Sequence, residues 1–309
     1  MSSISRLQSA ASAAVFALLV SGCGGGGGDT GTMPSAAPEP VSIRVAEVGF
    51  STPESVLHDE AADLYLVSNI NGTPTDKDGN GFISRVAPDG ALVELKWIDG
   101  QASGVTLHAP KGMAIANGNL YVADIDCLRS FDQVSGEPTG EICVDGATFL
   151  NDVAAALDGS VVFTDTGLDP SFAPSGTDAV YRLAGANVLT VLAHPNLGAP
   201  NGLVDTSDGI LVVTFMSGEV FRISPSVAPT PIVAPSGMQL DGVVELPNGR
   251  VLMSSWGDSC VYELSPSGET RCIIADVAAP ADIGADAGRN RVLIPLFNDN
   301  AVLIQTIPE

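Results

Sequence analysis

Hydrophobic and polar positions alternate along most of this chain, in short runs that end at turn residues. The segments DLYLVSNI (63–70) and FISRV (82–86) are examples, rich in aliphatic, β-branched and aromatic residues with a period of about two. Such alternation is typical of β-strands that bury one face. No segment sustains a helical period of 3.6 residues for more than a few turns. We therefore predict an all-β protein.

One phrase recurs six times along the chain: a small or apolar strand, a turn that is often Asp-Gly or Asn-Gly, and a second apolar strand. The copies begin at Pro53, Pro110, Leu150, Pro200, Leu240 and Pro280. Further strand-like segments such as SRVAPDGALVEL follow each copy. Repeats of this length that hold about four strands fit the blades of a β-propeller. The sequence predicts a six-bladed propeller of four-stranded blades.

The last repeat ends about one strand short of a complete blade. Near the start of the chain, the segment VSIRVAEV (41–48) has strand patterning and no other partner. We expect this segment to supply the outer strand of the sixth blade and to close the ring, which would remove the exposed edges of an open array. The propeller would then span residues 41–309.

The first forty residues follow another pattern. Arg6 precedes an apolar run (10–20) that is too short to cross a bilayer, which predicts a signal peptide at residues 1–22. The ending Leu-Val-Ser-Gly-Cys resembles a bacterial lipobox and implies acylation of Cys23, although a plain secretory signal with an incidental cysteine has the same pattern. Residues 23–40 are rich in Gly and Pro, typical of a flexible tether. Gly24 in place of Asp implies a lipid anchor in the outer membrane, facing the periplasm or the exterior.

Composition limits the partners of the chain. There are 36 acidic and 13 basic residues, for a net charge of −23. Such a surface repels nucleic acid and attracts cations. The hydrophobic content of 45% argues against disorder beyond the tether, and about 270 residues suffice for one large core. We expect a monomer.

Four cysteines besides Cys23 form two local pairs, Cys127 with Cys143 and Cys260 with Cys272. Each pair flanks a turn-rich segment, and an even number of cysteines in an oxidising compartment favours disulfides. We predict that each pair links the outer two strands of a blade, the second and the fifth. Neither pair has the spacing of a zinc site.

The segment TDKDGNGFIS (75–84) looks like the first half of an EF-hand calcium loop. Asp76, Asp78, Asn80 and Gly81 fit the pattern, but Ala87 stands where a bidentate Glu is needed. The strand patterning on both sides also contradicts a helix–loop–helix. We interpret the segment as the loop between the second and third strands of the first blade, at the channel mouth. It forms either a tight turn or an accessory cation site.

The second residue of each repeat copy begins an inner strand, so these six residues should form a ring at the upper mouth of the central channel. They are Glu54, Lys111, Asn151, Asn201, Asp241 and Ala281. Four of them carry oxygen atoms, and carboxylates with amides, without imidazole or thiolate, suit Ca²⁺ or another hard divalent cation. Each residue alone also fits an ordinary turn. Their shared phase in the repeat favours a metal site.

The phrases Pro53-Glu54, Asn151-Asp152, Pro200-Asn201-Gly202-Leu203 and Leu240-Asp241-Gly242 resemble the gluconolactonase and regucalcin-like family of six-bladed propellers. The resemblance implies a catalytic calcium held by Glu54, Asn151, Asn201 and Asp241. It also implies that Asp241 is the base that activates water against a lactone or ester, with a phosphotriester as another substrate. The chain departs from the family's pattern in the Pro-Glu-Ser phrase and in Lys111.

Other residues complete the candidate site. Lys111 is a candidate for holding a substrate carboxylate, and Trp256 and Phe297 for an apolar substrate wall. No Gly-x-Ser-x-Gly motif occurs and the only histidines are residues 58, 108 and 194, so a serine triad is disfavoured. A non-catalytic cell-surface propeller that binds a protein, peptide or sugar is the alternative, because the Asn-Gly and Asp-Gly phrases also occur in such proteins.

Overall fold

The computed structural model describes residues 40–224, 227–234, 236 and 238–309, which form one unit. The predicted signal peptide, Cys23 and all of the predicted tether except Pro40 lie outside the described residues. Among the residues that are described, no helix has the length and apolarity needed to cross a membrane.

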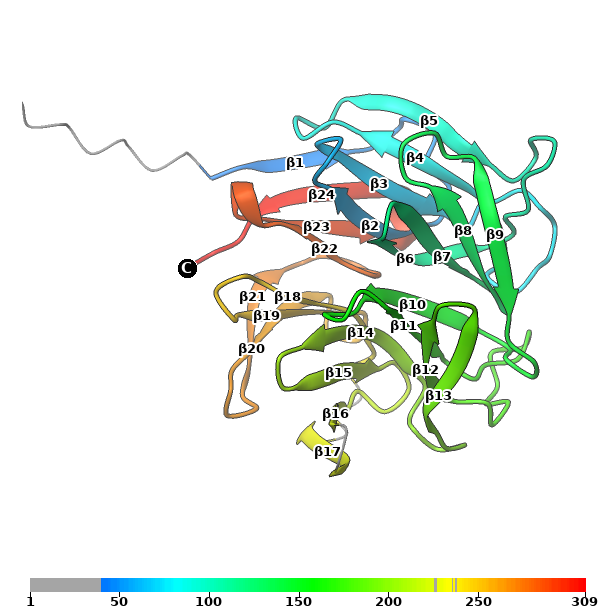
Figure 1. Cartoon of the computed structure of the whole chain (residues 1–309). Coiled ribbons are helices and arrows are strands. Elements are labelled where there is room, and N and C mark those ends of the chain that lie inside the picture. The colour runs from blue at the N-terminus through cyan, green and yellow to red at the C-terminus, as the bar shows by residue number, and fades with distance from the viewer. Residues whose placement is uncertain (1–39, 225–226, 235, 237) are drawn as a thin grey trace, which may run out of the picture. The chain divides into compact units, whose positions relative to one another are not determined.

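Six antiparallel sheets of four strands each build this unit, which is the predicted six-bladed propeller (Figure 1). Blade 1 contains β2 (Pro53–Asp59), β3 (Leu64–Asn69), β4 (Phe82–Val86) and β5 (Leu92–Asp99). Blade 2 contains β6 (Pro110–Ala116), β7 (Asn119–Asp124), β8 (Cys127–Asp132) and β9 (Pro138–Cys143). Blade 3 contains β10 (Leu150–Ala155), β11 (Val161–Asp165), β12 (Ala179–Ala184) and β13 (Asn187–Ala193).

The second half of the ring repeats this order. Blade 4 contains β14 (Pro200–Thr206), β15 (Gly209–Thr214), β16 (Val220–Ser224) and β17 (Val227–Val233). Blade 5 contains β18 (Leu240–Glu245), β19 (Val251–Ser255), β20 (Cys260–Leu264) and β21 (Thr270–Ala275). Blade 6 contains β22 (Gly284–Asp286), β23 (Arg291–Leu296), β24 (Ala301–Thr306) and β1 (Ser42–Val45), with the 3₁₀ turns η1 (Ala287–Arg289) and η2 (Phe297–Asp299).

The amino-terminal strand closes the ring, as predicted. β1 pairs antiparallel with β24, from Ser42 opposite Gln305 to Val45 opposite Val302, and Figure 1 shows the two strands side by side. The paired strand is shorter than the predicted segment 41–48. Glu47 and Gly49 have φ values of 59° and 103°, outside the extended region that a strand requires, so pairing ends at Val45.

Hydrophobic clusters fill the interfaces between neighbouring blades. Between blades 1 and 2, for example, Leu66 and Ile83 pack against Met113 and Phe131. Each of the other five junctions has a cluster of the same kind, including the one between blades 6 and 1. The apolar positions that alternate along the sequence are therefore the faces on which blades pack, and this packing holds the inner strands around the channel.

Both predicted disulfides are present. Cys127 of β8 is bonded to Cys143 of β9, and Cys260 of β20 is bonded to Cys272 of β21. Each disulfide links the outer two strands of its blade, the second and the fifth, as expected. In the chain-entropy model, loops of this length contribute about 3 kcal/mol each to stability.

The inner strand of blade 6 differs from the prediction. The sixth phrase begins at Pro280, but β22 starts only at Gly284. Just before Gly284 the backbone of Asp282 pairs with the inner strand of blade 1. Asp282 N–H donates to the Glu54 carbonyl (2.8 Å), and Val56 N–H donates to the Asp282 carbonyl (3.3 Å). This exchange joins the first and last blades beside the channel.

Candidate functional site

A bulge recurs at the start of the inner strands and directs the predicted ring residues into the channel. In β2, β6, β10, β14 and β18 the pairing with the second strand skips the second and third residues of the phrase. In β10, for example, Leu150 pairs with Asp165 and Val153 with Phe163, while Asn151 and Asp152 are skipped in the strand register. A bulge re-aims the side chains that it contains. The repeat thus places one polar residue from each of blades 1 to 5 at the same height.

Four of these residues present oxygen atoms that have no partner. They form what we call the oxygen ring: Glu54, Asn151, Asn201 and Asp241. All four side chains are buried, and one oxygen atom of each, Oε2 of Glu54 and Oδ1 of the others, makes no hydrogen bond within the protein. A buried polar atom without a partner is costly, and four at one place are rare unless a ligand satisfies them.

The orientation of Asn151 is set by its surroundings. Its Nδ2 donates to Thr166 Oγ1 (2.9 Å), and that hydroxyl donates to the carbonyl of Pro200 (2.8 Å). Because the amide nitrogen is occupied, the amide oxygen is the atom left for the channel. Neutral amide oxygens beside carboxylates are ligands that calcium accepts.

Electrostatics at the oxygen ring favour a positive ligand. Burial raises the pKa of Glu54 well above its ordinary value, and the carboxylates of Asp241 and Asp282 raise this pKa further. Burial, followed by Asp282, likewise raises the pKa of Asp241 well above normal. Ionised, these carboxylates repel each other at a site that water does not screen. A divalent cation would remove this repulsion, so the donor set fits calcium.

Lys111, the fifth member of the predicted ring, donates hydrogen bonds to backbone carbonyls and not to the ring oxygen atoms. Its side chain is only 1% exposed, and its Nζ donates to the carbonyls of Pro74 (3.1 Å) and Ala109 (3.2 Å). The ammonium also lies 4.4 Å from the centre of the Phe149 ring. Burial lowers the pKa of Lys111 to about 8, against the opposing effect of Glu54. Lys111 lines the site, but two backbone carbonyls already bind its ammonium group.

A cavity of about 330 Å³, which we call the upper cavity, lies over the oxygen ring. The structure brings all seven predicted metal-binding and substrate-binding residues to it: Glu54, Lys111, Asn151, Asn201, Asp241, Trp256 and Phe297. The predictions missed Phe149, Phe172 and Phe215, which also line the upper cavity.

Residues at a second equivalent position of the repeat form much of the wall of the upper cavity. The residue directly after the second strand of each blade is Ile70, Ile125, Thr166, Phe215, Trp256 or Phe297, and all but Ile125 line the cavity. Three consecutive blades therefore contribute an aromatic wall of Phe215, Trp256 and Phe297. The ring centres are 5.7 Å apart for Phe215 and Trp256 and 5.1 Å for Trp256 and Phe297. Phe215 could have been predicted from the sequence, because it occupies the same position directly after a second strand as Trp256 and Phe297.

Below the oxygen ring, the third residues of the phrases form another layer, which sequence reasoning also missed. Ser55, Asp152 and Asp282 line a lower cavity of about 520 Å³. These groups are satisfied within the protein: Ser55 Oγ donates to Asp282, and Asp152 accepts from the backbone of Val153 and Leu203. The corresponding residue Gly112 has no room for a side chain, because a Cβ there would lie 2.3 Å from Asp152 Oδ1.

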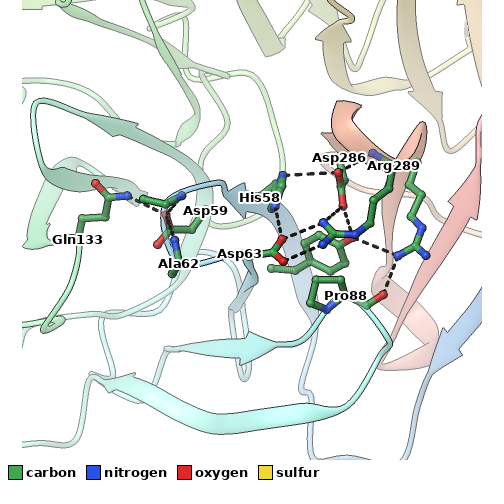
Figure 2. Close-up of polar contacts among 11 residues, drawn as sticks. His58, Asp59, Ala62, Asp63, Pro88, Gln133, Asp286 and Arg289 are labelled. Carbon is green, nitrogen blue, oxygen red and sulfur yellow. Dashed lines mark hydrogen bonds and ion pairs between the residues drawn. The ribbon is translucent and has the colours of Figure 1, made fainter.

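His58 lies at the lower end of the channel, in a polar cluster that Figure 2 shows. Its Nε2 is 3.3 Å from Asp63, which also forms a salt bridge with Arg289 (2.7 Å). Asp286 accepts hydrogen bonds from Tyr65 (2.6 Å) and Arg289 (2.9 Å). The cluster ties blade 1 to blade 6, and His58 belongs to it rather than to the upper cavity.

The loop that contains TDKDGNG is held by contacts of its own. Lys77 pairs with Asp126 (2.6 Å), Asp78 accepts hydrogen bonds from the backbone and side chain of Asn80, and Gly79 N–H donates to His108 Nδ1 (3.0 Å). Within the described part of the chain no group of three or more His, Cys, Asp or Glu side chains is placed to hold a metal. The oxygen ring has two carboxylates and two amides and is a different kind of donor set.

The described residues thus define a six-bladed β-propeller with a calcium-compatible oxygen ring beneath an aromatic cavity. No family model and no curated protein matches the sequence. Among solved structures, a gluconolactonase from Xanthomonas campestris is 17% identical with a TM-score of 0.68, over 87% of this chain and 90% of that one.

Two further structures have the same fold. Regucalcin, a calcium-binding protein from Agrobacterium tumefaciens, is 14% identical with a TM-score of 0.60, over 85% of this chain and 93% of that one. Virginiamycin B lyase from Staphylococcus aureus is 14% identical with a TM-score of 0.59, over 87% of this chain and all of that one. The resemblance to gluconolactonase and regucalcin propellers is confirmed for the fold. The lyase shows that this fold also carries other chemistry.

Proposed function

We propose that this protein is a calcium-dependent hydrolase of lactone or ester bonds. The observation that carries the proposal is the oxygen ring: four buried oxygen atoms from four blades, each without a partner, below a cavity that can admit a small molecule. The gluconolactonase and regucalcin neighbours support the proposal through their fold.

Glu54, Asn151, Asn201 and Asp241 would hold the calcium. When bound, the ion would polarise the substrate carbonyl as a Lewis acid. Asp241 would be ligand and base at once, and its carboxylate would take the proton from the attacking water. The aromatic wall would bind the remainder of the substrate and exclude other water. A phosphotriester would fit the same arrangement, with Asp241 as the nucleophile.

The test is turnover of a panel of lactones and aryl esters by the full chain, with calcium and after chelation. We expect hydrolysis that chelation abolishes and calcium restores, together with calcium binding by calorimetry that Glu54→Gln weakens. Turnover that survives chelation would contradict the calcium dependence. Absence of turnover across the whole panel, with calcium bound, would contradict the hydrolase.

A second candidate function has one observation in its favour. Lys111 brings a buried ammonium group to the ring of an otherwise oxygen-lined site, and this charge opposes a cation nearby. A non-catalytic propeller that binds a protein, peptide or sugar would need no calcium at that point. Calcium that binds only after Lys111→Met would favour this second function.

We also propose that Cys23 carries a lipid that anchors the protein in the outer membrane. The support is the lipobox-like sequence before Cys23 and the Gly-rich and Pro-rich segment after it. The test is incorporation of labelled fatty acid in cells, which Cys23→Ser should abolish. Fractionation of the envelope should then find the variant outside the membrane pellet.

A further inference from the structure

The wall of the upper cavity has a chemical character that narrows the class of substrate. Above the oxygen ring, five aromatic residues line it: Phe149, Phe172, Phe215, Trp256 and Phe297. Ile70 and Leu168 add aliphatic surface. An apolar wall of this kind binds ligand surface through burial, which contributes affinity in proportion to the apolar area that is covered.

The polar side chains beside this wall already have partners. Thr166 Oγ1 accepts from Asn151 and donates to Pro200, and Lys111 Nζ donates to two backbone carbonyls. Of the described side chains that line the cavity outside the oxygen ring, only Trp256 offers a buried polar atom, its Nε1, without a partner. A ligand that carries several hydroxyl groups would bury most of them unpaired, at a cost of about tenfold in affinity or more for each.

The floor and the wall therefore differ sharply in polarity. All four oxygen atoms without partners lie at the floor, on the inner strands, and the aromatic rings stand on the loops above. This division suits a molecule with its polar atoms at one end, such as the carbonyl of a lactone or ester, and a hydrocarbon body. A volume of about 330 Å³ holds on the order of ten water-sized volumes, enough for a substituted monocyclic or bicyclic compound.

Phe172 extends the wall to the rim. Its side chain is 48% exposed, and its ring centre lies 6.4 Å from that of Phe149. Asp169 holds the turn, since its carboxylate accepts from the backbone of Ser171 and Ala173. Phe172 itself has a φ of 59°, which is unfavourable for a residue with a bulky side chain. The turn thus keeps an apolar ring partly exposed at the mouth of the cavity, where a bound molecule could cover it.

We propose that the substrate is an apolar lactone or ester with an alkyl or aryl substituent, and that Phe172 and Trp256 select it. This inference rests on the proposed hydrolase function. It excludes a polyhydroxylated sugar lactone as the preferred substrate.

The experiment compares δ-valerolactone, δ-octalactone, δ-decalactone and glucono-δ-lactone as substrates of the calcium-loaded full chain. We expect kcat/KM to rise about fourfold for each buried methylene until the cavity is full, because each one buries a similar apolar area. Glucono-δ-lactone should be hydrolysed at least about 100-fold less efficiently than δ-decalactone. Equal or better hydrolysis of glucono-δ-lactone would overturn the proposal while upholding the hydrolase.

A binding measurement separates this proposal from the hydrolase itself. Lactams with the same alkyl chains resist hydrolysis, and their binding can be followed by the fluorescence of Trp256 in a Trp97→Phe variant. Trp97 lies away from the cavity, where it stacks on Arg85 (3.5 Å). Binding that tightens with chain length, in a protein that hydrolyses nothing, would support the apolar cavity and contradict the hydrolase. Absence of binding by the alkyl lactams would overturn the proposal.

Variants test the selecting residues. Phe172→Ala should lower kcat/KM for δ-decalactone at least about five times more than for δ-valerolactone, because the longer chain loses the covering ring. Val134→Ser is the matched control, since Val134 is 81% exposed in a turn of blade 2 and does not line the cavity. A Phe172→Ala loss that is equal for both lactones would contradict the role of Phe172 in selection.

Discussion

The two ends of the central channel treat buried carboxylates in opposite ways. At the upper end, Asp241 is buried with an oxygen atom that has no partner, and burial raises its pKa. At the lower end, the buried side chain of Asp286 accepts hydrogen bonds from Tyr65 and Arg289. Burial acts to raise the pKa of Asp286 as well, but these two donors outweigh it and hold the pKa below its ordinary value.

This difference identifies the upper end of the channel as a binding site and the lower end as a structural contact between two blades. The lower cluster in Figure 2 supplies an Arg and a Tyr for its carboxylates and so stabilises the junction of blades 1 and 6. Among the residues that the structure describes, no Arg or Tyr lines the upper cavity. Burial outweighs the lowering effects of Trp256 and Asn201 on the pKa of Asp241, so the ring carboxylates destabilise the protein until a ligand arrives. Groups that lack partners within the protein are the groups available for function.

The largest effect should follow Asp241→Asn. We expect kcat to fall by about 100-fold or more, because the variant has lost the base. Without calcium, however, the variant should be more stable than the wild type at neutral pH, by roughly 2–4 °C in Tm for each kcal/mol gained. We expect this gain in stability because the amide of the variant has no charge, so its burial does not carry the cost of burying a carboxylate. Activity assays measure the change in kcat, and thermal unfolding in the presence of a chelator measures the change in Tm. A lower Tm in the variant would contradict the difference between the two ends of the channel.

Asp286→Asn is the matching change at the lower end. It removes an anion that Arg289 and Tyr65 bind, so we expect a loss of about 2–3 kcal/mol in the free energy of unfolding. Calcium affinity should change little. Because the folded pKa of Asp286 is depressed, its contribution is present above about pH 4 and is lost on acidification. The difference in the free energy of unfolding between variant and wild type, measured by denaturant unfolding, should therefore become smaller below that pH.

Lys111→Met should have a smaller effect that depends on pH. The folded pKa of Lys111, about 8, lies below the ordinary 10.5, so its burial costs most when it is charged. The cost falls as pH rises from about 8 to 10.5, and wild-type stability should rise relative to the variant over this range. Calcium affinity should rise slightly in the variant. If Lys111 holds a substrate carboxylate, KM should increase more for anionic than for neutral substrates.

The smallest effect should follow Asp76→Asn with Asp78→Asn. Contacts within the loop already engage Asp78, and the oxygen ring contains neither residue. We expect the tightest calcium affinity to stay within about twofold of the wild type, measured by calorimetry. Loss of that affinity would place the metal site in the loop and leave the oxygen ring without its cation.

Much of the architecture could be predicted because it repeats. Asn201 and Asp241 fall at one phase of the phrase, and a bulge at that phase turns them inward in each blade. The closing strand and both disulfides followed from unpaired strand pattern and cysteine spacing. Phe215 could have been found in the same way, from its place directly after a second strand.

The remainder depends on loops that do not repeat. Phe172 stands in a turn between the second and third strands of blade 3, and Asp169 holds that turn through hydrogen bonds. The direction of Lys111 depends on the carbonyl of Pro74, which lies in a loop of another blade. Contacts between distant loops do not recur at a fixed spacing in the sequence, so they cannot be predicted from the pattern of the strands.

The pairing of β1 with β24 also dictates when folding can finish. Val41 N–H donates to Thr306 Oγ1 (2.7 Å) across 265 positions of the chain. During synthesis the last blade cannot be completed before residues 301–306 have been made, so its completion is the step with the largest loop to close. Until that moment β1 has no partner strand and presents an unpaired edge to other chains. A copy truncated before residue 301 would keep the first strand unpaired and would be prone to association.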